Sequence, residues 1–134
     1  MDWKLELIVV PVSDVDRAKR FYAEQVGFVL DGDHRVGDDL RVVQLTPPGS
    51  GCSIAVGIGL GEMVPGSLKG MQLVVSDIDA ARAELVERGV EASAVRHLDD
   101  GIWVDGRGGD WNSFVFFSDP DGNSWSVQER PAGG

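Results

Sequence analysis

Hydrophobic and polar residues follow a pattern along this chain that occurs twice. Each half opens with an apolar run typical of a strand, Leu5–Val10 in the first half and Met71–Val75 in the second. Apolar residues at helical spacing follow each run. They are Val15, Ala18, Tyr22 and Val26 in the first half, and Ile78, Ala81 and Leu85 in the second. The pattern therefore predicts a strand followed by a helix in each half.

The start of each predicted helix belongs to an internal repeat. The segment Val12–Lys19 reads Val-Ser-Asp-Val-Asp-Arg-Ala-Lys, and Val75–Arg82 reads Val-Ser-Asp-Ile-Asp-Ala-Ala-Arg. The side-chain oxygen of a serine or aspartate caps a helix by accepting from the free amides of the first turn. The candidates are Ser13 or Asp14 and Ser76 or Asp77. Gly27 and Gly89 suit the left-handed position that ends a helix.

Several short strand-like runs follow each helix, separated by segments rich in turn-forming residues. The runs are Gly27–Leu30, Leu40–Leu45, Ser53–Ile58, Val90–Val95, Ile102–Val104, Ser113–Phe117 and Ser124–Gln128. Residues 31–39 and 47–51 are predicted turns, and Asp119–Asn123 is a strong turn signal. The sequence predicts an α+β fold of two tandem β-α-β-β-β modules in a single domain, residues 1–134. The first module spans residues 1–60 and the second 71–134, joined by a linker at 61–70.

Composition and charge narrow the classes of function. The chain has 134 residues, 43% of them hydrophobic, which suits a globular domain. Its net charge of −10 disfavours nucleic acids and anionic membranes, because phosphate contacts need a positive surface. No apolar run approaches the length of a membrane span, and the first residues do not resemble a signal peptide, so a cytoplasmic protein is expected. The single Cys52 excludes an internal disulfide.

Three groups of residues carry a resemblance to a known family. They are Val12-Ser13-Asp14 with Arg20-Phe21-Tyr22 and Val26-Gly27-Phe28, then Val75-Ser76-Asp77 with Arg88-Gly89, then Phe116 to Asn123 (Phe-Phe-Ser-Asp-Pro-Asp-Gly-Asn). In this order they resemble the vicinal oxygen chelate superfamily, which includes glyoxalases, bleomycin-resistance proteins and extradiol dioxygenases. The resemblance implies that the modules form a curved mixed sheet around a cavity. It also implies a homodimer that takes a small-molecule ligand.

Metal-using members of that superfamily bind a divalent ion through His, Glu or Gln side chains. The resemblance maps three of these positions to Leu7, Gly70 and Ser126, and none of these side chains is a good divalent ligand. The remaining ligand belongs near Ser53–Ile58, where no His, Asp or Glu occurs. No metal cofactor is therefore expected. An atypical site remains open, built from Glu6, His34, or His97 with Asp99 in a His-x-Asp spacing; the alternative is that the two histidines are loop residues.

Strand alternation gives a provisional list of residues that face the cavity. If Leu7 points inward, Glu6 points away; a register shift of one residue reverses this. The expected polar contacts are Gln72, Ser126 and Gln128. Trp125 and Val127 are expected to pack behind them against helices. Trp103 and Trp111 are the candidate stacking residues, with burial in the core as the alternative for both.

These residues favour a protein that binds a small organic ligand in a metal-free cavity, as drug-binding bleomycin-resistance proteins do. The aromatic and acidic residues between Arg96 and Asp121 make a cationic aromatic compound one candidate ligand. A metal-dependent lyase, isomerase or dioxygenase is one alternative. A metal-free enzyme acting on a small metabolite is the other. The candidate catalytic residues are His97, Glu6, Asp99 and Asp100.

Overall fold

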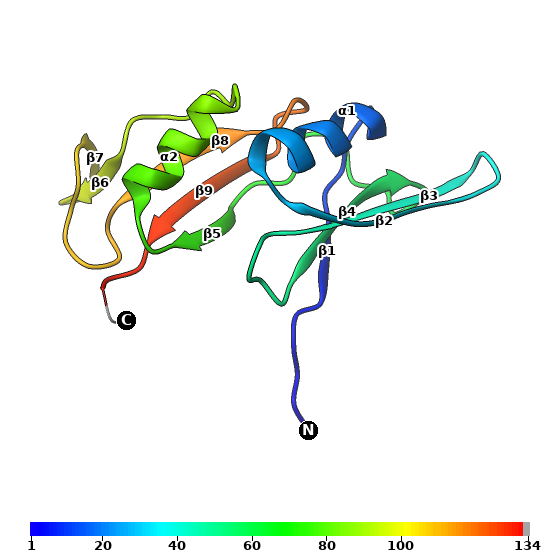
Figure 1. Cartoon of the computed structure of the whole chain (residues 1–134), viewed down its shortest axis with the longest axis horizontal. Coiled ribbons are helices and arrows are strands. Elements are labelled where there is room, and N and C mark those ends of the chain that lie inside the picture. Colours follow the sequence, from blue (N-terminus) through cyan, green and yellow to red (C-terminus); the bar gives the residue numbers. More distant parts are fainter. Residues whose placement is uncertain (133–134) are drawn as a thin grey trace. The chain divides into compact units, whose positions relative to one another are not determined.

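The computed structural model describes residues 1–132, with nine strands and two α-helices in that range (Figure 1). The contacts divide the chain into two units. The first comprises Met1–Leu68 together with Asp119–Asn123, and the second comprises Lys69–Ser118 together with the residues from Ser124 onward. Each unit holds one mixed sheet. The predicted α+β class is confirmed.

The first unit is a four-stranded sheet with a helical segment on one face. Its elements are β1 (Leu7–Val9), α1 (Val15–Arg20), a π-helical segment η1 (Phe21–Val26), β2 (Val29–Val36), β3 (Leu40–Thr46) and β4 (Ser53–Ile58). The strand order is β1-β4-β3-β2. The opening strand β1 pairs in parallel with the last strand β4, and the other pairs are antiparallel.

The second unit repeats this topology and adds one strand. Its elements are β5 (Met71–Val75), α2 (Ile78–Glu87), β6 (Arg96–Asp99), β7 (Ile102–Asp105), β8 (Phe114–Ser118) and β9 (Ser124–Glu129). The opening strand β5 again pairs in parallel with the last strand β9. The order β5-β9-β8-β6-β7 leaves β7 as an edge strand with no counterpart in the first unit. The strand run Ile102–Val104 was predicted and corresponds to β7, whereas β6 was not predicted.

Both helices begin and end at the signals in the sequence. Asp14 and Asp77 are the N-caps, and their carboxylates accept from the backbone N–H groups three residues later. Gly27 (φ 93°) and Gly89 (φ 86°) take the left-handed conformation after the helices. The first helix changes to π-helical geometry at Phe21, which the sequence analysis did not predict. Within residues 1–132, no helix is long and apolar enough to cross a membrane.

Two of the strand predictions are corrected by the structure. The segment Val90–Val95 is not a strand: Ser93 makes a local pair of hydrogen bonds with Phe116, but no continuous ladder forms. The segment Asp31–Val36, predicted as a turn, is instead part of β2 and pairs with β3 through a register shift near Gly32. Pairing with β3 outweighs the turn preference of Asp and Gly at this site.

The core of each unit lies between its sheet and its helix. In the first unit Val43, Leu45 and Val56 are fully buried, together with Ala18 and Tyr22 from the helical segment. In the second unit, Figure 1 shows α2 lying across β8 and β9. The buried residues there are Ile78 and Leu85 from α2 and Val115, Phe117, Trp125 and Val127 from the sheet. The prediction that Trp125 and Val127 pack on the helix side is confirmed.

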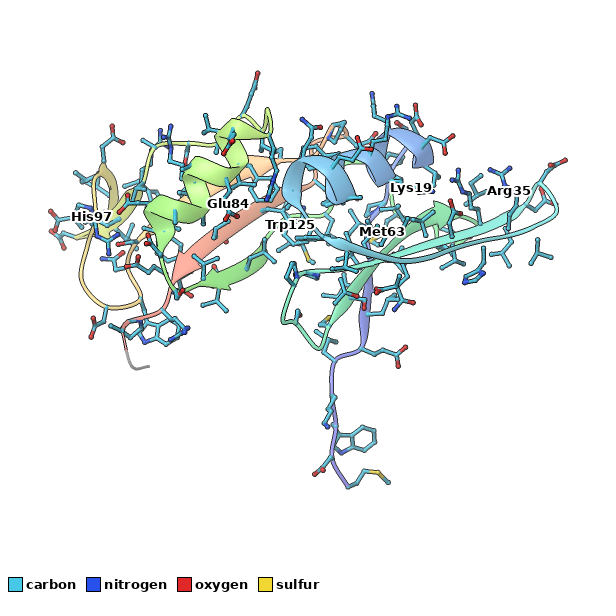
Figure 2. All side chains as sticks on the ribbon, in the orientation of Figure 1. Lys19, Arg35, Met63, Glu84, His97 and Trp125 are labelled. Carbon is cyan, nitrogen blue, oxygen red and sulfur yellow. The ribbon has the colours of Figure 1, made fainter. Side chains whose placement is uncertain are left out.

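A group of charged side chains stabilises the long β2–β3 hairpin on its helix-facing side. Figure 2 labels one of them, Lys19, on α1. The buried Arg41 contacts Asp33 (2.8 Å) and Asp16 (2.9 Å), and Lys19 contacts Asp33 (2.9 Å). These hydrogen bonds, chiefly that from Arg41, hold the pKa of the Asp33 carboxyl well below its usual range. The charge of Asp33 therefore stabilises the fold only while the carboxyl is ionised.

We expect Asp33→Asn to lower the free energy of unfolding by about 1 kcal/mol at pH 7, because the buried guanidinium of Arg41 loses the negative charge of an exposed partner and keeps Asp16. The folded pKa of Asp33 lies below the unfolded value of about 3.9, so its contribution is present above that pH and is lost as the pH falls toward the folded pKa. The difference between wild type and variant should shrink from pH 4 to pH 2 in urea titrations. Asp38→Asn, in the exposed turn after β2, is the control; equal losses from both variants would contradict the prediction.

The turn Asp119–Asn123 is built into the first unit by buried polar contacts. The Tyr22 hydroxyl donates to Asp119 Oδ2 (2.7 Å), and the Asn123 side-chain NH2 donates to the same oxygen (2.7 Å). Asn123 also donates to the carbonyl of Pro11 (2.8 Å) and accepts from the N–H of Leu68 (3.1 Å). Asn123 is fully buried. The turn that the sequence predicts at Asp119–Asn123 thus satisfies backbone groups from two other segments.

Replacing Asn123 with Ala should lower the free energy of unfolding by about 2–4 kcal/mol, because Pro11 and Leu68 then keep unpaired backbone groups away from water. Urea unfolding measures the loss. The matched control is Asn112→Ala, since the half-buried Asn112 also bonds backbone groups, the N–H and carbonyl of Leu98, and these bonds are solvent-exposed. Water replaces those bonds, so a loss at Asn112 as large as that at Asn123 would contradict the assignment.

Candidate functional site

The sheet of the second unit has one face that its helix does not cover. Along β8, Val115 and Phe117 are buried on the helix side, while Phe114 and Phe116 point to the other face. The register of β8 with β9 sets Gln128 opposite Phe114 and Ser126 opposite Phe116. These residues therefore share one face of the sheet, called the open face below.

An aromatic cluster occupies the outer part of the open face. Trp103 on the extra strand β7 lies edge-on to Phe114 (ring centroids 5.3 Å apart) and to Phe116 (5.1 Å). The two phenylalanine rings are nearly parallel, with centroids 6.2 Å apart. Trp103 is nevertheless 46% exposed. A large aromatic surface thus contacts solvent on a sheet whose other face is closed.

A chain of hydrogen bonds runs beside the aromatic cluster. The Ser126 hydroxyl donates to Gln72 Oε1 (2.9 Å), and Gln72 Nε2 donates to Gln128 Oε1 (3.0 Å). Gln128 Nε2 donates to the backbone carbonyl of Trp111 (2.8 Å). The structure therefore brings together the three residues that were predicted as polar contacts, and joins them to Trp111.

The charged groups of the open face form a pair. Arg96 on β6 lies opposite Asp105 on β7, and Arg96 Nε is 3.2 Å from the Asp105 carboxylate. Arg96 is also the cross-strand neighbour of Phe114. Because the two charges are opposite, the pair adds no net charge beside the aromatic cluster.

Trp111 lies in the loop between β7 and β8, and Arg107 at the start of this loop pairs with two carboxylates. Trp111 has a left-handed backbone (φ 60°), which is rare for a bulky residue. Arg107 bonds Asp79 (2.9 Å) and Glu129 (2.5 Å). The pKa of Glu129 is lowered, first because its carboxylate accepts from the Ile78 N–H and then because of Arg107. An open groove of about 500 Å³ lies here, lined in part by Arg107, Trp111 and Glu129.

Two of the predicted catalytic candidates, His97 and Asp99, do not share the open face of their own sheet. His97 and Asp99 alternate with Leu98, the cross-strand partner of Trp103, so they point to the other face of the β6–β7 hairpin. Figure 2 shows His97 on this hairpin, and His97 Nδ1 is 2.9 Å from the carbonyl oxygen of Gly106. Asp100 is in the hairpin turn. Glu6 is exposed just before β1 in the first unit.

The first unit also has an open face, and Leu7 lies on it. Leu7 pairs with Ser53 on β4, whose hydroxyl contacts Thr46 Oγ1 (2.7 Å) and Gln44 Nε2 (3.2 Å). The Thr46 hydroxyl also donates to the carboxylate of Asp31. His34, on β2, is exposed. This face combines polar residues with apolar ones such as Leu7 and Val42, and no aromatic pair lies on it among the described residues of the first unit.

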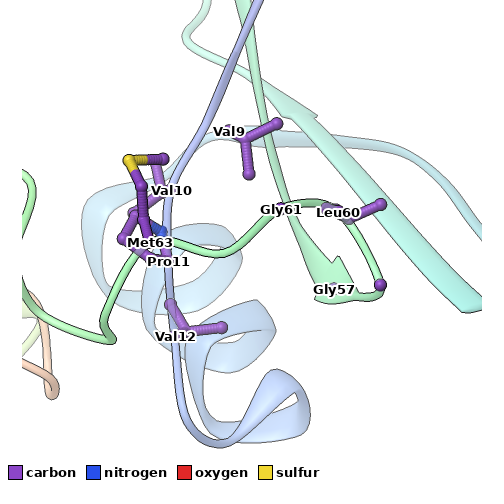
Figure 3. A pocket seen from close by; sticks show the side chains of 9 residues that line it. Val9, Val10, Pro11, Val12, Gly57, Leu60, Gly61 and Met63 are labelled. Carbon is purple, nitrogen blue, oxygen red and sulfur yellow. The ribbon is translucent and has the colours of Figure 1, made fainter. Parts of the chain in front are cut away.

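A small apolar cavity in the first unit is not large enough for an organic ligand. It has a volume of about 70 Å³ and lies between the chain at Val9–Val12 and the loop after β4 (Figure 3). Ligand pockets are usually ~300–1,000 Å³. Figure 3 shows Met63 beside Pro11 and Val10 at one wall of this cavity, so it belongs to the packing of the loop.

Comparison with known proteins places the chain in a family. The model of the Glyoxalase/Bleomycin resistance protein/Dioxygenase superfamily matches residues 4–127. The chain belongs to this superfamily. The predicted resemblance is thus confirmed over nearly the whole sequence.

Several known proteins are similar to this chain along nearly their full length. TnmS3, an antibiotic binding protein from Streptomyces sp. CB03234, is 36% identical, with 96% of this chain and 97% of that one covered at a TM-score of 0.78. A superfamily member from Sphaerobacter thermophilus DSM 20745 is 29% identical, with coverage of 96% and 98% and a TM-score of 0.76. The uncharacterized protein YetH of Bacillus subtilis (strain 168) is 27% identical over 125 residues, 91% of this chain and 94% of the relative.

The side chains present do not fit the superfamily's metal. At the three mapped positions, the side chains of Leu7 and Gly70 have no atom that could bind a metal ion. Ser126 has a neutral hydroxyl, which donates its hydrogen bond to Gln72. Within residues 1–132, no group of three or more His, Cys, Asp or Glu side chains could hold a metal ion. The atypical candidates His34 and Glu6 belong to the first unit and His97 to the second.

Sequence reasoning missed Phe114 and Phe116 as part of the site. Their signal was available: in the run Phe114–Ser118, alternation separates Phe114 and Phe116 from the buried Val115 and Phe117. The contact of Gln128 with the Trp111 carbonyl had no such signal. It depends on the path of the loop between β7 and β8 and on the clamp made by Arg107.

Trp103→Ala should lower the free energy of unfolding by less than about 2 kcal/mol, because half of the ring already contacts water. The control is Trp125→Ala, which removes a ring that is 3% exposed and stacked on Phe117, and should cost about 3–5 kcal/mol. Urea unfolding followed by far-UV circular dichroism compares the two variants. If Trp103→Ala destabilises the fold as much as Trp125→Ala, Trp103 is a core residue.

Proposed function

We propose that this protein binds a small organic molecule with a planar aromatic part on the open face of the second sheet, without a metal cofactor. The observation that carries the proposal is the solvent-exposed aromatic cluster of Trp103, Phe114 and Phe116 next to the polar chain of Ser126, Gln72 and Gln128. Aromatic rings with a few oriented polar groups are typical of small-molecule sites. Trp111 adds a second exposed ring at the edge of the face.

The relatives support binding of this kind. TnmS3 is described as an antibiotic binding protein, and it is similar to this chain over nearly the whole length of both. The superfamily itself includes enzymes as well as bleomycin-resistance proteins, so the choice between them depends on the site.

The side chains of the open face favour binding over catalysis. A general acid or base must reach the reacting atoms, and His97 and Asp99 point to the other face of their hairpin. The charged groups on the open face, Arg96 and Asp105, are paired with each other. Metal-dependent chemistry would need donor side chains at Leu7, Gly70 and Ser126. The proposal also includes that the protein is a homodimer and acts in the cytoplasm.

The same charges favour an uncharged aromatic ligand over a cationic one. The carboxylate nearest to Trp103 on this face, that of Asp105, already neutralises Arg96. The polar chain consists of amides and a hydroxyl, which recognise neutral hydrogen-bonding groups. A cation would gain only the contact with the ring faces.

We expect Trp103→Ala to weaken the binding of the planar, uncharged probe 2-methoxynaphthalene at least tenfold, because the largest ring of the cluster is removed. Isothermal titration calorimetry on the full chain gives the dissociation constants. Trp3→Ala removes an exposed tryptophan from the first unit and is the control. Equal affinity of wild type and Trp103→Ala would place binding elsewhere and contradict the proposal.

Elemental analysis of the purified, tag-free protein should find no stoichiometric Zn, Ni, Mn or Fe. Adding back Zn²⁺, Ni²⁺, Mn²⁺ or Fe²⁺ should give no heat of specific binding, because the mapped positions lack donor atoms. One equivalent of bound metal, with heat that is lost in His34→Ala or His97→Ala, would instead establish an atypical site and revive metal-dependent chemistry.

A further inference from the structure

The hydrogen-bond chain on the open face has only one possible direction. A backbone carbonyl oxygen has no hydrogen to donate, so the group of Gln128 that faces the carbonyl of Trp111 must be its NH2. The oxygen of Gln128 then faces Gln72, which must present its own NH2. The oxygen of Gln72 in turn faces Ser126, whose hydroxyl must donate. One backbone carbonyl thus fixes the orientation of three side chains.

This direction decides what the site offers to a ligand. The only proton of the Ser126 hydroxyl is used by Gln72, so toward a ligand Ser126 presents lone pairs alone and accepts. Each glutamine NH2 has a second hydrogen that the chain does not use, so Gln72 and Gln128 can donate. An acceptor and a donor therefore lie side by side, because Ser126 and Gln72 are cross-strand partners in the register of β5 with β9.

The aromatic cluster places a ring next to this acceptor and donor. Phe116 is the cross-strand neighbour of Ser126, on the same face, and directly opposed residues have Cβ atoms about 4.5–5.5 Å apart. A planar ligand that packs on Phe116 and Trp103 thus brings its edge to Ser126. A hydroxyl on that edge can donate to Ser126 and accept from Gln72. An ether oxygen only accepts, and the lone pairs of Ser126 would face it unpaired.

We propose that Ser126 and Gln72 form a specificity site for an aromatic hydroxyl group, so that the ligand is a planar phenol-type compound. This inference rests on the proposed function, since the ring must occupy the open face. Metal-using members have a metal-binding residue at the position of Ser126. In this chain we assign to Ser126 the recognition of the hydroxyl hydrogen of the bound compound. Gln128 is a positioning residue: it holds Gln72 in the orientation that makes Ser126 an acceptor.

The test compares the binding of 2-naphthol and 2-methoxynaphthalene by isothermal titration calorimetry on the full chain. In the second compound a methyl group replaces the hydroxyl hydrogen. Wild type should bind 2-naphthol about three- to tenfold more tightly, the gain expected from one hydrogen bond. Ser126→Ala should abolish this preference by weakening 2-naphthol alone. Ser124→Ala, two residues away on the same strand and face, should keep the preference.

Gln128→Leu provides the test of orientation. It frees the Gln72 amide to turn over, so the preference for 2-naphthol should fall at least twofold although Gln128 does not contact the hydroxyl. Equal binding of both probes to wild type, with both weakened by Trp103→Ala, would overturn the hydroxyl site and leave the proposed function standing. Loss of both probes in equal measure in Ser126→Ala would also overturn it. Binding of neither probe to wild type would overturn both proposals.

Discussion

The sheet of the second unit is covered by a helix on one face only, and this constraint decides what the residues of its central strands β8 and β9 do. Because successive side chains of a strand point to opposite faces, one set must be apolar and closely packed while the other remains accessible. In β8 and β9 the buried set is Val115, Phe117, Trp125 and Val127. The accessible set contains the rings and amides of the open face. Core and candidate site are thus two sides of the same strands, so a change of register by one residue would exchange them.

The remaining polar groups of the core are satisfied by contacts between segments that are distant in sequence. The turn Asp119–Asn123 links β8 and β9 of the second unit but belongs to the first unit, where Asn123 completes the hydrogen bonds of Pro11 and Leu68. The buried Arg41 is paired with Asp33 in its own hairpin and with Asp16 from the first helix. In both places a buried polar group has a partner, and no buried side-chain polar atom of the described residues lacks one.

The open face carries the aromatic cluster and the chain of amide hydrogen bonds on which the proposed binding site rests. The extra strand β7 brings Trp103 onto Phe114 and Phe116. The loop that follows brings the carbonyl of Trp111 to Gln128, and Arg107 holds the base of that loop. The polarity of the amide chain follows from this one carbonyl. The electrostatic character of the candidate site is therefore set by the orientation of its amide and hydroxyl groups, because Arg96 and Asp105 at its edge neutralise each other.

The sequence by itself determined the repeat, the caps of both helices, the α+β class and the helix-side burial of Trp125 and Val127, because these depend on short-range periodicity and on local hydrogen bonds. Alternation also indicated that Gln72, Ser126 and Gln128 share a face. Only the tertiary structure decided which strands pair, so that Asp31–Val36 became strand, Val90–Val95 did not, and β6 formed at Arg96–Asp99. It also decided that His97 points away from Trp103 and that Trp111 fixes the amide chain. Those outcomes depend on register and on loop paths between distant residues, which no local pattern encodes.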